Sequence, residues 1–311
     1  MALATYLTAV QNLLGTGGAG NLYPNATLTT YINTARSQIA AEGQCVRALP
    51  PISGPITIVT IQMGGSGYGS PTVILSAPDS PSGQGAFPSG QQASATATVS
   101  GTSITAVTLS STGQGYFTPI VTFSGAGTGA VAIAVVSGIA QTVINQEVYP
   151  FATFNPLVAT SGSGISSVYM VNGVSMVWAT FRYTLERVSF SKYQARVRNY
   201  TTGYTYIPGI WSQFGQGANG SLYVYPIPNA AYQMELDCLC LPINLATDTD
   251  PEALPYPWSD AVPFLAAYYA YQGSQRNADA DRMWNEFQKF MKRARQMSNP
   301  RSVSNWYGRA G

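Results

Sequence analysis

Residues 64–78, GGSGYGSPTVILSAP, have the glycine density of a loop that binds phosphate. In a dinucleotide-binding loop the glycines open a helix, whose N-terminus holds the pyrophosphate. Here a proline and a β-branched run follow instead, which is typical of a turn between strands. The pattern returns about fifty residues later as TGQGYFTPIVTFSGA, which indicates a duplicated unit. We therefore interpret the glycine loop as a turn.

The two copies of this turn share three residue types at matching positions. The repeat-turn residues are Gly67, Tyr68 and Pro71 in the first copy and Gly115, Tyr116 and Pro119 in the second. A second pair of segments, ASATATVSG and GAVAIAVVSG, is also similar in sequence. The repeat indicates a small β unit built twice.

Histidine is missing from the chain. This excludes the Ser-His-Asp triad, the Cys-His dyad, the usual zinc sites and the commonest general base. The hydroxyl-rich stretches have no such base to activate them. We therefore predict no catalytic residue, no cofactor and no metal site, and a protein that is not an enzyme.

One group of acids has a spacing that suits calcium. The sequence DTDPE holds Asp248, Asp250 and Glu252, but it lacks the glycine and the distal glutamate of an EF-hand loop. Its Pro251 suits a connector. We favour a solvated linker over a metal site.

The C-terminal segment combines several basic residues with an aromatic pair. From position 289 to the end there are six basic residues and no acid. Bases at the end of a helix complement its dipole. Trp306 and Tyr307 are flanked by arginines, which is the composition of an interface anchor. The phosphates of a nucleic acid would also attract this basic segment. Because the net charge is only +2, we favour protein docking over nucleic-acid binding.

The composition indicates a subunit of an assembly. Charged residues make up 9% of the 311 residues, against about 25% in an ordinary soluble domain. Because hydrophobic residues reach 45% and are patterned, we expect packed structure with much of its surface covered by neighbours. Three cysteines without a framework pattern indicate reduced thiols. With neither a signal peptide nor an apolar span of membrane length evident, we expect a soluble protein made inside a cell.

Helical periodicity marks both ends of the chain. Apolar residues recur at helical spacing over 3–14, ended by Gly15, and over 27–43, with Thr27 as N-cap and Gly43 as end. A third helix begins behind Ser259, and a fourth covers 278–297. Since each apolar stripe needs a partner, we expect these helices to pack together as one domain.

The middle of the chain has the pattern of strands. We predict a hairpin around Asn172-Gly173, and two strands joined across Pro228-Asn229. Residues 48–181 contain no Lys or Arg, and this shift in composition indicates an insertion. The predicted class is α+β: a helical domain built from N- and C-terminal helices, a β-sandwich or barrel-like middle domain and an inserted all-β repeat domain. The predicted divisions are 1–53, 54–140, 141–250, 251–298 and an extended arm at 299–311.

Three stretches resemble one protein family. They are LTTYINTARSQIAAEGQCVR, GSLYVYPIPNAAYQMELDCLCLPINL and LPYPWSDAVPFLAAYYAYQGSQRNADADRMWNEFQKFMKRARQ. Together they resemble the head-to-tail adaptors of short-tailed bacteriophages, also called tail tubular protein A or head-completion proteins. The resemblance covers residues 20–50 and 141–300 in outline, while 54–140 is similar to Gly-Tyr-Pro β repeats of other virion proteins.

The resemblance implies a structural virion protein at the head-tail junction, assembled in the cytoplasm of the host bacterium. It implies a ring of about twelve copies that joins the portal protein to the tail tube or nozzle. Tail fibres, and weak non-specific contact with the passing DNA, are further implied partners, and a membrane is not. The portal contacts implied here are Lys292, Arg293, Arg295, Arg301, Trp306, Tyr307 and Arg309.

Two other classes remain as alternatives. In a receptor- or glycan-binding tail component, the 54–140 repeats would use Tyr68 and Tyr116 as sugar platforms. A cell-wall hydrolase would need a pair of acids in a cleft. The scarcity of acids in the insert disfavours the hydrolase, and neither class explains helices at both ends.

Overall fold

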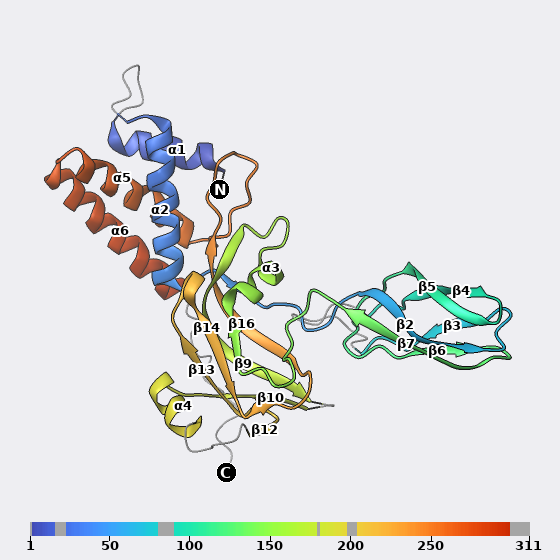
Figure 1. Cartoon of the computed structure of the whole chain (residues 1–311). Helices are drawn as coiled ribbons and strands as arrows, with labels where there is room; N and C mark the ends of the chain where they lie inside the picture. The colour runs from blue at the N-terminus through green and yellow to red at the C-terminus, as the bar shows by residue number, and fades with distance from the viewer. Residues whose placement is uncertain (1, 16–22, 80–89, 179–180, 198–203, 299–311) are drawn as a thin grey trace, which may run out of the picture. The chain divides into compact units, whose positions relative to one another are not determined.

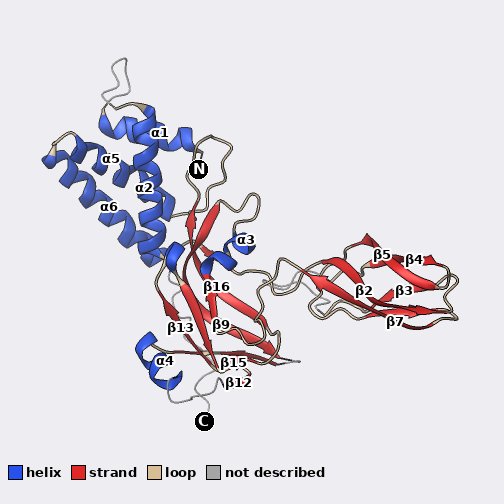
Figure 2. Cartoon of the chain, in the orientation of Figure 1, coloured by secondary structure: helices blue, strands red, loops and turns tan. Residues whose placement is uncertain are grey.

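The computed structural model describes residues 2–15, 23–79, 90–178, 181–197 and 204–298. The chain divides into two compact units, one made of 1–47, 159–169 and 239–311 and the other of 48–158 and 170–238. Helices lie at both ends of the sequence and strands fill its middle, so the predicted α+β class is confirmed (Figure 2).

The first unit is organised around helix α5 (Val262–Gly273). It lies against α1 (Leu3–Leu14), α2 (Asn25–Gly43) and α6 (Asn277–Ser298) (Figure 1). Because three helices cover α5, most of its circumference is apolar, and its buried residues are Val262, Pro263, Leu265, Ala266, Ala267, Ala270 and Tyr271. The outer helix α6 buries one stripe instead, made of Ala280, Met283, Phe287, Met291 and Ala294. Among the described helices, none is long and apolar enough to cross a membrane.

Two predicted helix starts are wrong, for local reasons. Helix α2 begins at Asn25, and Thr27 lies inside its first turn because the Leu28 amide already bonds to Pro24 O at 3.1 Å. Ser259 lies in the 3-10 turn η3 (Trp258–Ala261), and α5 starts only at Val262. The predicted end of α1 is confirmed, since Gly15 adopts the left-handed conformation after Leu14.

Outside residues 54–140, most strands form two four-stranded sheets. One has the order β1-β16-β9-β10, from β1 (Arg47–Ala48), β16 (Gln233–Pro242), β9 (Ile165–Trp178) and β10 (Phe181–Thr184). The other has the order β11-β13-β14-β8, from β11 (Glu186–Arg187), β13 (Ile210–Phe214), β14 (Ser221–Tyr225) and β8 (Val148–Pro150). The remaining elements are η1 (Phe151–Thr153), α3 (Asn155–Val158), α4 (Phe190–Val197), β12 (Thr205–Tyr206), η2 (Gly217–Asn219) and β15 (Ile227–Pro228).

The predicted hairpin at Asn172-Gly173 is wrong. Strand β9 runs straight through both residues, and it pairs antiparallel with β10, from Trp178 opposite Phe181 to Ser175 opposite Thr184. The Asn172 side chain donates a hydrogen bond of 2.9 Å to Asp237 Oδ2 instead of closing a turn. Pairing with neighbouring strands has outweighed the local turn preference. The two strands predicted on either side of Pro228-Asn229 exist as β14 and β16, but they belong to different sheets.

Residues 54–140 contain the six strands of the duplicated unit. They are β2 (Ile56–Ser66), β3 (Thr72–Leu75), β4 (Ser94–Ser100), β5 (Ser103–Ser111), β6 (Val121–Ser124) and β7 (Thr128–Val136). The two halves exchange strands: β2 of the first half pairs with β7 of the second, β5 of the second pairs with β4 of the first, and β3 pairs with β6. The shared core therefore draws apolar side chains from both halves.

The repeated tyrosines lie inside this fold. Tyr68 is 4% exposed and Tyr116 is fully buried. The Tyr116 hydroxyl accepts a hydrogen bond from the Ala93 amide at 2.9 Å and donates one to Ser76 O at 3.1 Å. It thereby joins the second half of the duplicated unit to the first.

We predict that Tyr116→Phe destabilises the insert by about 1–3 kcal/mol, because it leaves the buried Ala93 amide without its acceptor. Hydrogen exchange of the peptide that contains Ala93, with chemical denaturation, measures the effect. Tyr68→Phe is the matched control, since no bond of its hydroxyl is seen among the described residues. Equal effects of the two variants would contradict this assignment.

Candidate functional site

The described part of the predicted portal-contact set lies near the end of α6. Lys292, Arg293 and Arg295 are exposed, while Met291 and Ala294 in the same turns are buried. The helix therefore presents a cationic surface of three side chains beside its core-facing stripe. Arg301, Trp306, Tyr307 and Arg309 lie outside the described residues.

A tryptophan fixes the point from which the C-terminal segment leaves α6. The Trp258 indole is 4% exposed, and its Nε1 donates a hydrogen bond of 3.0 Å to Ser298 Oγ. Its ring also packs on the end of α2, where a Cβ added to Gly43 would lie 2.6 Å from Trp258 Cζ3. Thus one side chain holds the last described residue of α6 against two other elements.

The acids of the DTDPE stretch make separate structural contacts. Asp248 Oδ1 accepts a hydrogen bond from the Ala4 amide in the first turn of α1. Asp250 Oδ2 accepts from the amides of Ala246 and Thr247, and these bonds lower the pKa of Asp250. Within the described ranges, no three His, Cys, Asp or Glu side chains gather in a way that would hold a metal ion.

The prediction of a solvated linker is wrong for Glu252, because this acid forms a buried ion pair. Its side chain is 7% exposed, and that of Arg36 on α2 is fully buried. Arg36 Nη2 lies 2.7 Å from Glu252 Oε1, and Arg36 Nε lies 3.0 Å from Glu252 Oε2. Arg36 Nη1 also donates to Ile243 O at 2.6 Å. The guanidinium therefore clamps the segment between β16 and α5 onto α2.

The surroundings of Glu252 keep it ionised. Burial by itself raises the pKa of the carboxyl, but the hydrogen bonds from Arg36 and the Leu254 amide outweigh it, and the net pKa lies below its ordinary value. The neighbouring Tyr6 is fully buried, and its pKa is raised by burial and then by the negative charge of Glu252. Arg36 and Glu252 therefore form a charged pair at neutral pH within the helical unit.

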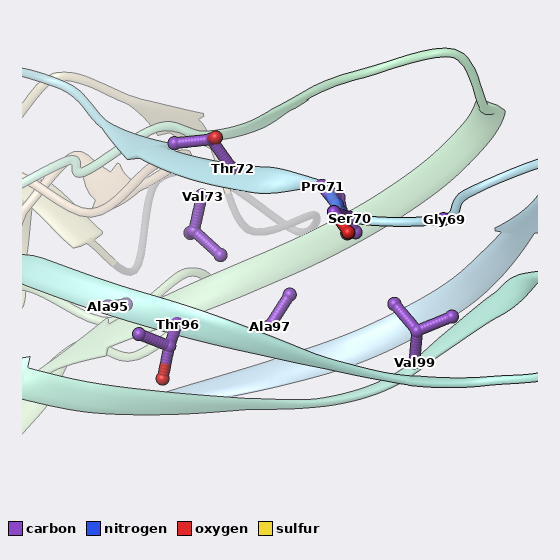
Figure 3. A pocket seen from close by; sticks show the side chains of 9 residues that line it. All are labelled: Gly69, Ser70, Pro71, Thr72, Val73, Ala95, Thr96, Ala97 and Val99. Atoms are coloured by element: carbon purple, nitrogen blue, oxygen red, sulfur yellow. The ribbon is translucent and has the colours of Figure 1, made fainter.

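The repeat-turn residues form turns and not a phosphate site. Gly67 and Gly115 have φ of 80° and 83°, which favours glycine, and strands β3 and β6 follow them. Since Tyr68 and Tyr116 are buried, they cannot stack on a sugar, and the expectation of tyrosine platforms is wrong. Pro71 borders an open pocket of about 530 Å³ between β3 and β4, whose lining residues are Gly69, Ser70, Pro71, Thr72, Val73, Ala95, Thr96, Ala97 and Val99 (Figure 3). Its only side-chain polar groups are hydroxyls, and none of its lining residues carries a charge.

Residues 48–181 contain two acids, Asp79 and Glu147, and both have structural partners. The Asp79 carboxylate accepts hydrogen bonds from the Phe117 amide at 2.7 Å and the Thr118 amide at 3.0 Å. Glu147 Oε1 accepts one from the buried Tyr193 hydroxyl at 2.7 Å. Each carboxylate therefore fastens a local element, and neither forms a carboxylate pair of the kind that hydrolases use.

Sequence reasoning missed Arg36 and the contacts of Trp258. Arg36 follows Ile32 by one turn, so helical periodicity places its charge on the apolar stripe of α2. A charge on that stripe signals a buried partner, but spacing alone does not say that the partner lies 216 positions away. Nothing in the sequence around Trp258 identifies Ser298 as its acceptor.

We predict that Glu252→Gln lowers the free energy of unfolding by about 3–5 kcal/mol, because Arg36 stays buried with its charge uncompensated. Since the folded-state pKa of Glu252 is depressed, its stabilisation is present above its unfolded value of about 4.3 and is lost as pH falls through the folded value. Denaturation at several pH values should show a steeper acid loss in the wild type than in the variant. Parallel pH profiles would contradict the role given to this pair.

We predict that Trp258→Phe costs about 1 kcal/mol by removing the bond to Ser298. Hydrogen exchange of residues 291–298 should become faster. Trp284→Phe, at a half-buried ring on the same helix, is the control and should leave these amides unchanged. Unchanged exchange in Trp258→Phe would show that the indole does not hold the helix end.

The family comparison covers nearly the whole chain. A family model described as SU10 adaptor protein matches residues 1–309. Among curated proteins, none matches this sequence. A match of this extent includes both helical ends and all the strands between them. The chain therefore belongs to the SU10 adaptor protein family, a family of phage structural proteins.

Proposed function

We propose that the protein is a head-to-tail adaptor of a bacteriophage. About twelve copies form a closed ring that joins the portal protein to the tail tube or nozzle, and the genome passes through it during ejection. The observation that carries this proposal is the match of the adaptor family across residues 1–309. The protein acts as a connector in the virion, after assembly in the cytoplasm of the host.

The end of α6 supports a contact with the portal. Lys292, Arg293 and Arg295 form an exposed cationic surface, and Trp258 holds the helix end in place. A fixed cationic surface suits an acidic groove on a partner. The arm at 299–311 adds Arg301, Trp306, Tyr307 and Arg309, which would supply aromatic anchors and further charge.

The scarcity of charged residues supports the proposal that the protein is a subunit of an assembly. With 9% charged residues, the surface has little to keep copies apart in solution. We assign 1–53 and 251–298 to the portal-facing helical domain, 141–250 to a β domain that faces the tail tube, and 54–140 to an insertion. Tail fibres are further partners of the β domain. Contact with DNA is weak and independent of sequence, and no membrane is involved.

Replacing the three cations tests the portal contact. We predict that Lys292→Gln/Arg293→Gln/Arg295→Gln weakens binding of the full chain to its portal ring by about tenfold or more, because charge pairing and steering are lost. The loss should shrink at high salt, where the wild type also binds less. Binding is measured by surface plasmon resonance or by co-sedimentation.

A second triple variant serves as the matched control. Arg276→Gln/Arg282→Gln/Lys289→Gln removes the same number of charges from exposed positions on and beside α6, so the net charge of the two variants is equal. We expect this control to bind the portal like the wild type. Equal weakening in both variants would indicate a general charge effect, and would contradict a contact at the helix end.

A further inference from the structure

The ribbon of β2 and β7 carries large apolar side chains on its solvent side. Its outward residues are Ile58, Thr60, Met63, Val131, Ile133 and Val135, here called the β2–β7 outer face. The five apolar members are between 44% and 62% exposed. The register places Ile58 opposite Val135 and Met63 opposite Val131, so they lie together on one surface.

Two of the three β7 residues that face the core, Ala132 and Ala134, are smaller than the residues that face solvent, while the third is Val136. Ala132 and Ala134 pack on the core cluster, while Val131 and Ile133 point away from it. An antiparallel ribbon with one buried face ordinarily shows the opposite alternation. Burial within this chain therefore does not explain the outward residues.

The duplication supplies an internal comparison. Strands β4 and β5 pair in the register that β2 and β7 use: Thr98 opposite Ala106, Thr96 opposite Thr108 and Ser94 opposite Ser111 correspond to the three outward pairs of the ribbon. Their inward residues stay apolar, as Ala95, Ala97, Val107 and Leu109. The outward residues of this second ribbon, here called the β4–β5 outer face, are hydroxyl residues and one alanine.

Comparison of the two ribbons shows which apolar residues the fold requires. One fold is built twice, and its interior is apolar in both halves. Of the two ribbons, each of which takes one strand from each half, only β2–β7 is apolar on its outer face. Large apolar residues on the β2–β7 outer face are therefore dispensable for folding, and they mark a surface that contacts something else.

The chemistry of the face restricts its partner to an uncharged apolar surface. Among residues 54–140, only Asp79 is charged, and its carboxylate is already bonded to Phe117 and Thr118. A charged partner surface would lose its hydration without gaining an opposite charge. The same face on a second copy meets the requirement, since it is equally apolar and carries no charge.

The area fits a weak contact between copies. Five side chains of this size, each about half exposed, present roughly 500 Å² per copy, so two faces together would bury about 1,000 Å², the lower limit for a specific interface. We propose that the β2–β7 outer face packs against the same face of a second copy of this chain. A face that packs on itself joins copies in pairs about a two-fold axis, so this contact is separate from the repeated interface that closes the proposed ring. It is too small to hold two copies permanently by itself.

Replacing the apolar residues of the β2–β7 outer face with their counterparts on the β4–β5 outer face tests this contact. In Ile58→Ala/Met63→Ser/Val131→Ser/Ile133→Thr/Val135→Thr, each outward apolar residue becomes its counterpart on the β4–β5 outer face. Sedimentation velocity of the full chain over a concentration series measures self-association. We expect the wild type to associate with rising concentration and the variant to associate about tenfold or more weakly. The matched control, Ser94→Ala/Thr96→Ser/Thr98→Ser/Thr108→Ser, should behave like the wild type.

A photo-crosslinking residue identifies the occupant and needs only one substitution. Placed at Ile133, and in a control protein at its counterpart Thr96, it is activated in a mixture of ¹⁴N- and ¹⁵N-labelled chains. We expect mixed-isotope links from position 133 to peptides within 56–66 or 128–136, and none from 96. A wild type that stays monomeric, equal association of both variants, or links from 133 to other segments would each overturn the proposal. Portal binding by the face variant should persist, so failure here is distinguishable from failure of the adaptor function.

Discussion

The buried ion pair between Arg36 and Glu252 joins two parts of the chain that are separated by the whole β region. Taking both charges out of water is tolerable only if they meet in good geometry and their remaining groups find partners. The bonds from Arg36 to Ile243 O and from the Leu254 amide to Glu252 meet that condition. The chain must therefore leave the helical unit after α2 and return to it before α5. This return brings Trp258 to the ends of α2 and α6, and so sets where the C-terminal segment begins.

A related constraint governs the duplicated insert, where neither half is complete alone. Because β2 pairs with β7 and β5 with β4, each half needs a strand from the other. The interior consequently has to keep its apolar residues in both halves, and Tyr116 has to reach across to Ala93 and Ser76. The outer faces are free of that requirement. They have diverged, which leaves one of them suited to contact between two copies of this chain.

Sequence reasoning succeeded where one local pattern determined the structure. The apolar stripe of α6 and the stop at Gly15 follow from helical spacing and from glycine's access to the left-handed region. It failed at Asn172-Gly173, where pairing with adjacent strands determined the conformation. Glu252 was placed in solvent because its partner is remote in sequence. The repeat was visible from its turns, but the burial of its tyrosines and the contrast between its outer faces required the strand register. Part of the predicted portal set lies beyond the described residues.

The adaptor function rests on what the full chain does when it meets a portal ring. Native mass spectrometry of the mixture, with electron microscopy of the same sample, tests it most directly. We predict a complex of fixed mass in which many copies cap one end of the portal and leave an open axial channel. A portal ring that stays bare while the chain is folded and in excess would contradict the head-to-tail assignment.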